Sequence, residues 1–181
     1  MDSIMSQVNW QEELLEQLMT DYGQDILQLV YTYVRDNALA EDLTQEIFIK
    51  CYRALSNYKG QATLKTWLWR IAINHTKDYL KSWHTRHMTV TEAQQFEHLT
   101  DNESVEQMIE QQESQRTVID AVMKLPIKYR ELVYLHYFEE YSLQEMAQIL
   151  KVNRNTLKTR LRKARMLLSE HLERSFENEF I

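Results

Sequence analysis

Apolar side chains recur every three or four residues along most of the chain, which is the spacing of one face of an α-helix. Trp10, Leu14 and Leu18 begin the first such series. It predicts one long helix over residues 10–35, or two abutting helices that meet at Gly23, because glycine weakens a helix interior. No stretch of useful length alternates apolar and polar residues as a half-buried strand would.

Two further helices are predicted over residues 38–55 and 66–81, with a polar loop at 56–65 between them. The helix at 66–81 is unusual because apolar or aromatic side chains occupy every side of it. Such a helix is either buried on most sides or presents its aromatic rings to a partner, for example by stacking them on unpaired bases. Composition alone favours the buried interpretation.

The middle of the chain differs in composition from the rest. Apolar residues become sparse around residues 89–100, and no Lys or Arg occurs between His87 and Gln115, whereas acidic residues accumulate there. A segment with few apolar residues and one sign of charge cannot bury enough surface to hold a fixed shape. We therefore expect a flexible acidic linker at residues 83–103.

Helical spacing resumes at Ser104 and predicts helices over residues 104–124 and 127–138. Pro126 either ends the first of these helices or begins the second, since a proline is tolerated in the first turn. A polar tail is expected over residues 169–181.

Residues 141–165 have the pattern of two short helices joined by a turn. Ser142, followed three residues later by Glu145, is typical of a capping box at the start of the first helix. Asn153 is a favourable N-cap for the second. In the second helix an apolar stripe begins at Leu157 and recurs at helical spacing, so one side of that helix is expected to be buried.

The other side of this second helix is basic. No Asp or Glu occurs between residues 153 and 165, and the Lys and Arg residues of the segment are Arg154, Lys158, Arg160, Arg162, Lys163 and Arg165. A helix-turn-helix motif with such a face is the arrangement that enters a DNA major groove. A solvated basic helix in a helical protein would show the same charges.

Composition supports an all-α fold, because two glycines and one proline in 181 residues leave few positions for tight turns. The net charge of -6 does not exclude DNA binding, because DNA responds to the local electric field of the surface that it contacts and not to the charge of the whole chain. The single cysteine, Cys51, cannot form an internal disulfide, which suits a reducing cytoplasm. No apolar run is long enough to span a membrane, and the first residues lack the order of a signal peptide. We expect a cytoplasmic protein with no membrane insertion.

Three segments together resemble the extracytoplasmic-function (ECF) sigma factors of bacteria, which have only the two domains called region 2 and region 4. The segments are AEDLTQEIFIKCYRAL (40–55), YKGQATLKTWLWRIAINHTKDYLK (58–81) and LPIKYRELVYLHYFEEYSLQEMAQILKVNRNTLKTRLRKAR (125–165). They cover most of the chain in the order and spacing of that family. The resemblance implies an all-α protein of two small helical domains: region 2 at 1–82 and region 4 at 104–181, joined by the flexible linker at 83–103.

The resemblance also implies that the second helix of the helix-turn-helix reads the −35 promoter element. The family's base-reading positions fall on Lys158, Thr159 and Arg162, and the expected phosphate contacts are Arg154, Arg160, Lys163 and Arg165. Asn155 stands where the family often has glycine, and Leu157 where it often has valine. Asn155 would either contact DNA or only cap the helix.

In region 2 the resemblance implies that Asp42, Gln45 and Glu46 dock on the clamp helices of the polymerase β′ subunit. The loop at 57–65 and the helix after it would capture a flipped-out base of the −10 element and hold its strand. The residues expected at the −10 element are Asn57, Lys59, Trp67, Trp69, Arg70, Asn74 and Lys77, with Lys81 as a further phosphate contact. Trp67 has the alternative of a purely structural role.

These expectations describe a sigma subunit that directs RNA polymerase core to promoter DNA, contacts the β′ clamp helices and the β flap, and is restrained by an anti-sigma protein. No catalytic residue, metal, cofactor or small-molecule substrate is expected. A dimeric helix-turn-helix repressor or activator would explain residues 141–168 alone. A metal hydrolase would have to use histidines and Cys51, but no acid–histidine motif surrounds His84 and His87.

Overall fold

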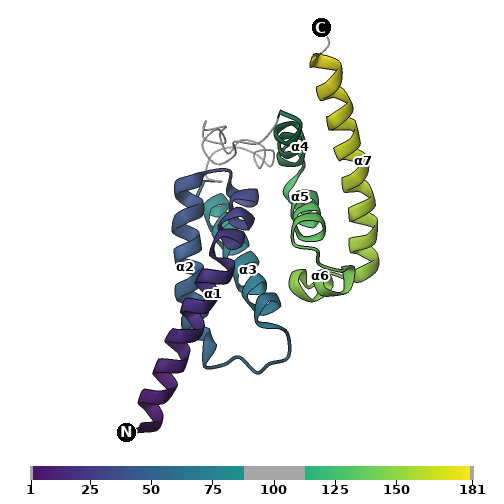
Figure 1. The fold of residues 1–181 in the computed structure, drawn as a ribbon. Helices are drawn as coiled ribbons and strands as arrows, with labels where there is room; N and C mark the ends of the chain where they lie inside the picture. The colour runs from purple at the N-terminus through teal and green to yellow at the C-terminus, as the bar shows by residue number, and fades with distance from the viewer. Residues whose placement is uncertain (1, 88–112, 180–181) are drawn as a thin grey trace. The chain divides into compact units, whose positions relative to one another are not determined.

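The computed structural model describes residues 2–87 and 113–179, and its regular elements in these ranges are all helices. They form two compact units that divide near residue 95 (Figure 1). The prediction of an all-α chain with two helical domains is therefore confirmed. The linker predicted at 83–103 lies largely outside the described residues, as does the beginning of the second predicted domain.

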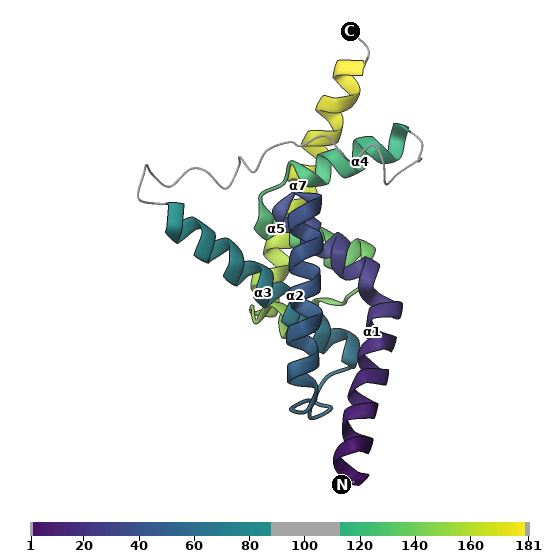
Figure 2. The ribbon, with the colours of Figure 1, turned by 90° about the vertical axis from the view of Figure 1, so that its left-hand side faces the viewer.

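The first unit consists of α1 (Asp2–Val34), α2 (Asn37–Leu55) and α3 (Leu64–His87), and each of these helices packs against the other two (Figure 2). α1 runs unbroken through Gly23, so of the two predicted alternatives the structure has the single long helix. Leu18 and Ile26, on either side of the glycine, are both buried. Their packing against the neighbouring helices stabilises α1 across its weakest residue.

Helix α3 is longer than predicted at both ends. Its first turn is capped by Thr63, whose hydroxyl oxygen accepts the backbone N–H of Thr66 at 3.1 Å. At the other end, residues 83–87 were expected to belong to the linker but remain helical. The stretch contains no glycine or proline, and the Arg86 guanidinium donates to the Ser82 hydroxyl one turn earlier at 2.9 Å. The expected linker therefore starts at least five residues too early.

The second unit contains α4 (Glu113–Met123), α5 (Ile127–Val133), the π-helical turn η2 (Tyr134–Phe138), α6 (Leu143–Leu150) and α7 (Arg154–Glu179). Pro126 stands directly before α5, so of the two alternatives it begins a helix. The segment expected only as a polar tail is helical as far as residue 179.

The core of the second unit lies between α7 and the helices before it. Its buried centre consists of Val122, Leu125, Val133 and Ala164, with α7 contributing the last of these. Arg130 is buried beside this core, and its Nε and Nη2 both donate to the backbone oxygen of Leu125, at 3.1 and 2.7 Å. Because Ala164 of α7 packs in this core, one side of α7 is buried and the opposite side is exposed. Within residues 2–87 and 113–179, no helix is both long and apolar enough to cross a membrane.

Candidate functional site

Helices α6 and α7 form the predicted helix-turn-helix motif. Glu145 donates its backbone N–H to the Ser142 hydroxyl oxygen at 3.3 Å, and its carboxylate accepts the Ser142 N–H at 2.9 Å, which completes the capping box. Lys151 ends α6 in the left-handed conformation, at φ 54°. Asn153 then caps α7 by accepting the N–H of Asn155 on its side-chain oxygen at 2.8 Å. Both predicted caps are confirmed.

α7 separates an apolar side from a polar one. Leu157, Leu161 and Ala164 are buried, whereas the predicted base-reading residues Lys158, Thr159 and Arg162 are all exposed. The Thr159 hydroxyl donates to the backbone oxygen of Asn155 at 3.1 Å, which leaves its lone pairs available to accept a hydrogen bond. The structure therefore brings these three side chains together on the solvent side of one helix.

Asn155 lies beside these three residues and its side chain is exposed. The oxygen that caps α7 belongs to Asn153, so capping does not account for Asn155. Of its two predicted roles, the exposed position favours contact with a partner.

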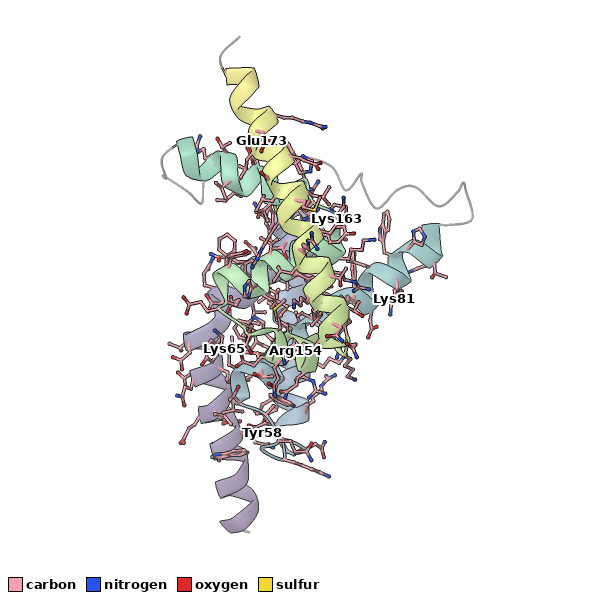
Figure 3. The ribbon with its side chains drawn as sticks, turned by 90° about the vertical axis from the view of Figure 1, so that its right-hand side faces the viewer. Tyr58, Lys65, Lys81, Arg154, Lys163 and Glu173 are labelled. Atoms are coloured by element: carbon pink, nitrogen blue, oxygen red, sulfur yellow. The ribbon has the colours of Figure 1, made fainter. Side chains whose placement is uncertain are left out.

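The predicted phosphate-binding residues do not all share that face. Arg154 and Lys163 are exposed on α7, where Figure 3 labels both. At 3.6 residues per turn, Arg160 lies about 160° around the helix from both Lys158 and Arg162, and it is only partly exposed. Arg165 is engaged: its Nε donates to the Tyr137 hydroxyl at 2.6 Å, and its guanidinium lies 5.7 Å from the centre of that ring.

A pocket of about 290 Å³ lies where the loop between α2 and α3 meets α3. Its lining combines amide, cationic and aromatic side chains, and consists of Asn57, Tyr58, Lys59, Gln61, Ala62, Trp67, Arg70, Ile71 and Asn74. An aromatic wall with a few hydrogen-bonding groups is typical of a site for one planar, polar ligand group. This pocket is therefore the best-defined candidate site of the first unit.

The pocket unites five of the seven residues predicted for the −10 element: Asn57, Lys59, Trp67, Arg70 and Asn74. The sequence predicts a role for the loop as a whole but not for Tyr58 and Gln61 individually, which also line the pocket. Their signal was their position in the glycine-containing loop directly before the tryptophan-rich helix. Lys77 lies further along α3, with its ammonium 6.0 Å from the centre of the Tyr33 ring. It does not line the pocket.

Trp69 does not belong to this surface, and its predicted contact with DNA is wrong for this structure. Its side chain is 0% exposed. The Tyr22 ring meets it edge-on, with ring centres 5.4 Å apart, and the Lys65 ammonium lies 5.0 Å from its ring centre. Two residues along a helix is about 200° of rotation, so Trp67 and Trp69 point to nearly opposite sides. Trp69 faces the core, and Trp67 faces the pocket.

The third predicted surface is the outer face of α2. Asp42, Gln45 and Glu46 are exposed there, and Ile49, one turn beyond Gln45, is 52% exposed. Glu46 also contacts α3, because its carboxylate lies 2.8 Å from Nε2 of His75. An exposed isoleucine surrounded by acidic and amide groups is the composition of a protein interface with a small apolar centre.

Among the described residues, the side chains that a metal hydrolase would need are not brought together. Burial raises the pKa of the Cys51 thiol to about 12, which keeps it protonated and unreactive at neutral pH. In the parts of the chain that the structure describes, no group of three or more His, Cys, Asp or Glu side chains is placed to hold a metal ion.

Comparison with known proteins identifies both units. The family model described as Sigma-70 region 2 matches residues 18–86, and the one described as Sigma-70, region 4 matches residues 115–168. The RNA polymerase sigma-H factor of Pseudomonas aeruginosa is 34% identical over 163 residues, which cover 86% of this chain and 84% of that protein. The ECF RNA polymerase sigma factor SigW of Bacillus subtilis is 32% identical over 158 residues, which cover 83% and 84%.

Solved structures share the fold. The sigma factor RpoE of Bartonella quintana, in complex with the anti-sigma factor NepR, matches with a TM-score of 0.67 at 20% identity and covers 87% of this chain and 96% of its own. CnrH, in complex with the cytosolic domain of CnrY, matches with a TM-score of 0.62 at 19% identity, with coverage of 90% and 89%.

Proposed function

The chain belongs to the ECF group of RNA polymerase sigma factors, which direct core polymerase to promoters, and from that membership we propose how its own residues divide this work. Region 4 reads the −35 element as duplex DNA, and region 2 captures the opened −10 element. The outer face of α2 holds the polymerase. The protein acts through binding alone and carries out no covalent step.

At the −35 element, α7 enters the major groove with its solvent side. Arg162 is the residue best suited to a guanine, because a guanidinium can donate two parallel hydrogen bonds to O6 and N7, worth about 1–3 kcal/mol of discrimination. Lys158 and Thr159 contact neighbouring base edges, and Asn155 joins them. Arg154 and Lys163 hold phosphates on either side, which positions the helix without reading sequence.

At the −10 element, the pocket receives one base that has left the stack. The Trp67 ring supplies a stacking surface, and the amides of Asn57, Gln61 and Asn74 offer donors and acceptors to the base edge. Lys59 and Arg70 neutralise the adjoining phosphates. The strongest support for this role is that residues of the loop and of the helix that follows it line a single pocket.

Polymerase core is held by Asp42, Gln45 and Glu46, with Ile49 as an apolar anchor, on the β′ clamp helices. Charged groups on such a surface set orientation and association rate as well as affinity. The β flap is the proposed second contact, on region 4. Tethering both units to one large enzyme raises the effective concentration of each DNA-reading surface, which allows an acidic chain to bind a promoter.

An anti-sigma protein is proposed as the opposing partner. RpoE of Bartonella quintana is seen with the anti-sigma factor NepR. The same kind of inhibitor would cover the surfaces of this chain that polymerase or promoter DNA would otherwise contact. RNA polymerase, the proposed partner of this chain, works on chromosomal DNA. We therefore propose that the chain acts in the cytoplasm.

Gel-shift measurements with and without core polymerase test the proposed function directly. The purified chain is expected to leave promoter duplex unshifted, and the holoenzyme is expected to shift it and to give run-off transcripts from a randomised promoter library. Each reading surface is small, so neither unit alone supplies enough affinity. Tight, specific duplex binding by the chain without polymerase would instead identify a helix-turn-helix repressor or activator.

Replacing Asp42 and Gln45 together with alanine is expected to weaken capture by core polymerase about tenfold or more, since the charge pairs and hydrogen bonds of an interface are lost together. The measurement is a titration of core with fluorescently labelled protein. Asp21 and Gln24 make a matched control, because they are the same residue types at the same spacing, exposed on α1. Equal weakening by both double variants would place the interface elsewhere.

A further inference from the structure

Tyr58 closes the loop that forms one wall of the pocket. Its hydroxyl donates a hydrogen bond to the backbone oxygen of Ala62. Its ring lies against that of Trp67, with ring centres 5.2 Å apart and planes inclined by 54°. Figure 3 labels Tyr58 in this loop. One side chain thus connects the start of the loop to its end and to the first turns of α3.

Both ends of the loop are held by hydrogen bonds. The N–H groups of Asn57 and Tyr58 donate to the last carbonyls of α2, each at 3.0 Å. At the far end the Thr63 hydroxyl caps α3. The residues in between, 59–61, are exposed. Their path therefore depends on what spans the gap between the two anchored ends.

Gly60 shows that this path is specific. Its φ is +67°, in the left-handed region that side chains disfavour, and a Cβ at this position would meet nothing within 4 Å. The glycine is therefore required by the backbone conformation and not by crowding. We call residues 58–62 the arch. The left-handed Gly60 in its middle reverses the direction of the chain, and the hydrogen bond from Tyr58 to Ala62 joins its two ends.

We propose that Tyr58 is a positioning residue for the pocket, which sets where Lys59 and Gln61 present their ammonium and amide groups and thereby which base the pocket accepts. Lys59 and Gln61 both line the pocket from the arch, whereas Trp67 and Asn74 line it from α3. Discrimination between bases requires the amide on the arch to keep a fixed distance from the aromatic wall. The inference rests on the proposed capture of a −10 base.

The Tyr58→Phe variant removes the hydroxyl and keeps the ring that packs on Trp67. The holoenzyme is titrated with four single-stranded −10 oligonucleotides that differ only in the captured base. The ratio between the preferred and the other bases is expected to fall about two- to tenfold, the effect of one lost hydrogen bond. A role confined to stability would weaken all four oligonucleotides equally and leave the ratio unchanged, which would overturn the proposal.

Trypsin cleavage of the full chain without polymerase reports the loop independently. Cleavage after Lys59 requires the arch to open, so the fragment 1–59 is expected to form several-fold faster in Tyr58→Phe. Tyr129→Phe is the matched control, because it removes a hydroxyl from the other unit and is expected to alter neither measurement. An unchanged cleavage rate after Lys59 would overturn the closure of the loop by Tyr58.

The two measurements separate the ways in which the inference can fail. Faster cleavage with an unchanged base ratio would refute the link between the arch and base choice. If the holoenzyme with Tyr58 intact shows no preference among the four oligonucleotides, the proposed base capture itself is refuted, whatever the cleavage rate.

Discussion

Replacing Trp69 with alanine is expected to lower the free energy of unfolding of region 2 by about 3–5 kcal/mol. The side chain is fully buried and contacts Tyr22 and Lys65, so its loss leaves a cavity among α1 and α3. All four tryptophans, Trp10, Trp67, Trp69 and Trp83, belong to the first unit. Tryptophan fluorescence during urea unfolding therefore reports this unit alone, in the variant as in the parent.

Trp67→Ala provides the comparison, because it removes the same side chain from a half-buried position two residues away. Its unfolding free energy is expected to change much less, whereas promoter opening by its holoenzyme slows. If the two variants lost equal stability, the assignment of Trp69 to the core and Trp67 to the pocket would be refuted. The rate of promoter opening is measured by potassium permanganate footprinting of the opened −10 strand.

Replacing Arg162 with alanine is expected to abolish the preference for one base pair of the −35 element. The loss of a bidentate contact to guanine removes about 1–3 kcal/mol, or about five- to 150-fold in relative affinity. Arg162→Lys is expected to lose most of the same preference, because an ammonium keeps the charge but not the planar pair of donors. The base preference is measured by letting a set of −35 promoter variants compete for the holoenzyme.

Lys163→Ala removes an equal charge from the adjacent position of α7. It is expected to weaken binding to every −35 variant by a similar factor, as the loss of a phosphate contact does. A preference at the same base pair that survives Arg162→Ala would remove Arg162 from the base-reading residues. If Lys163→Ala instead changed the base preference, Lys163 and not Arg162 would be the base-reading residue.

The helix-turn-helix motif was predictable because local chemistry determines it. Each cap acts within the first turn of the helix that it begins: Ser142 with Glu145 at α6, and Asn153 at α7. The spacing of these residues in the sequence is therefore enough to predict the hydrogen bond. The buried stripe of α7 follows from the same helical period. The fold class and the exposed face of α7 could therefore be derived without coordinates.

Other features depend on tertiary contacts and were not predictable. Helix α3 is apolar on every side, so its period could not tell which tryptophan faces the core. The pocket depends on Tyr58, whose hydroxyl reaches Ala62 and whose ring reaches Trp67. The continuation of α7 to residue 179 was missed because a polar sequence is equally compatible with an exposed helix and with a tail.

The engagement of Arg165 by Tyr137 affects how promoter affinity responds to ionic strength. Each phosphate neutralised by a protein cation releases condensed counterions, and contributes about −0.9 to the slope of log affinity against log salt. Because Nε of Arg165 donates to the Tyr137 hydroxyl at 2.6 Å, we expect fewer cations of α7 to contact the DNA backbone than its sequence contains. The affinity of region 4 for duplex DNA is therefore expected to be less sensitive to salt than a count of its Lys and Arg residues would suggest.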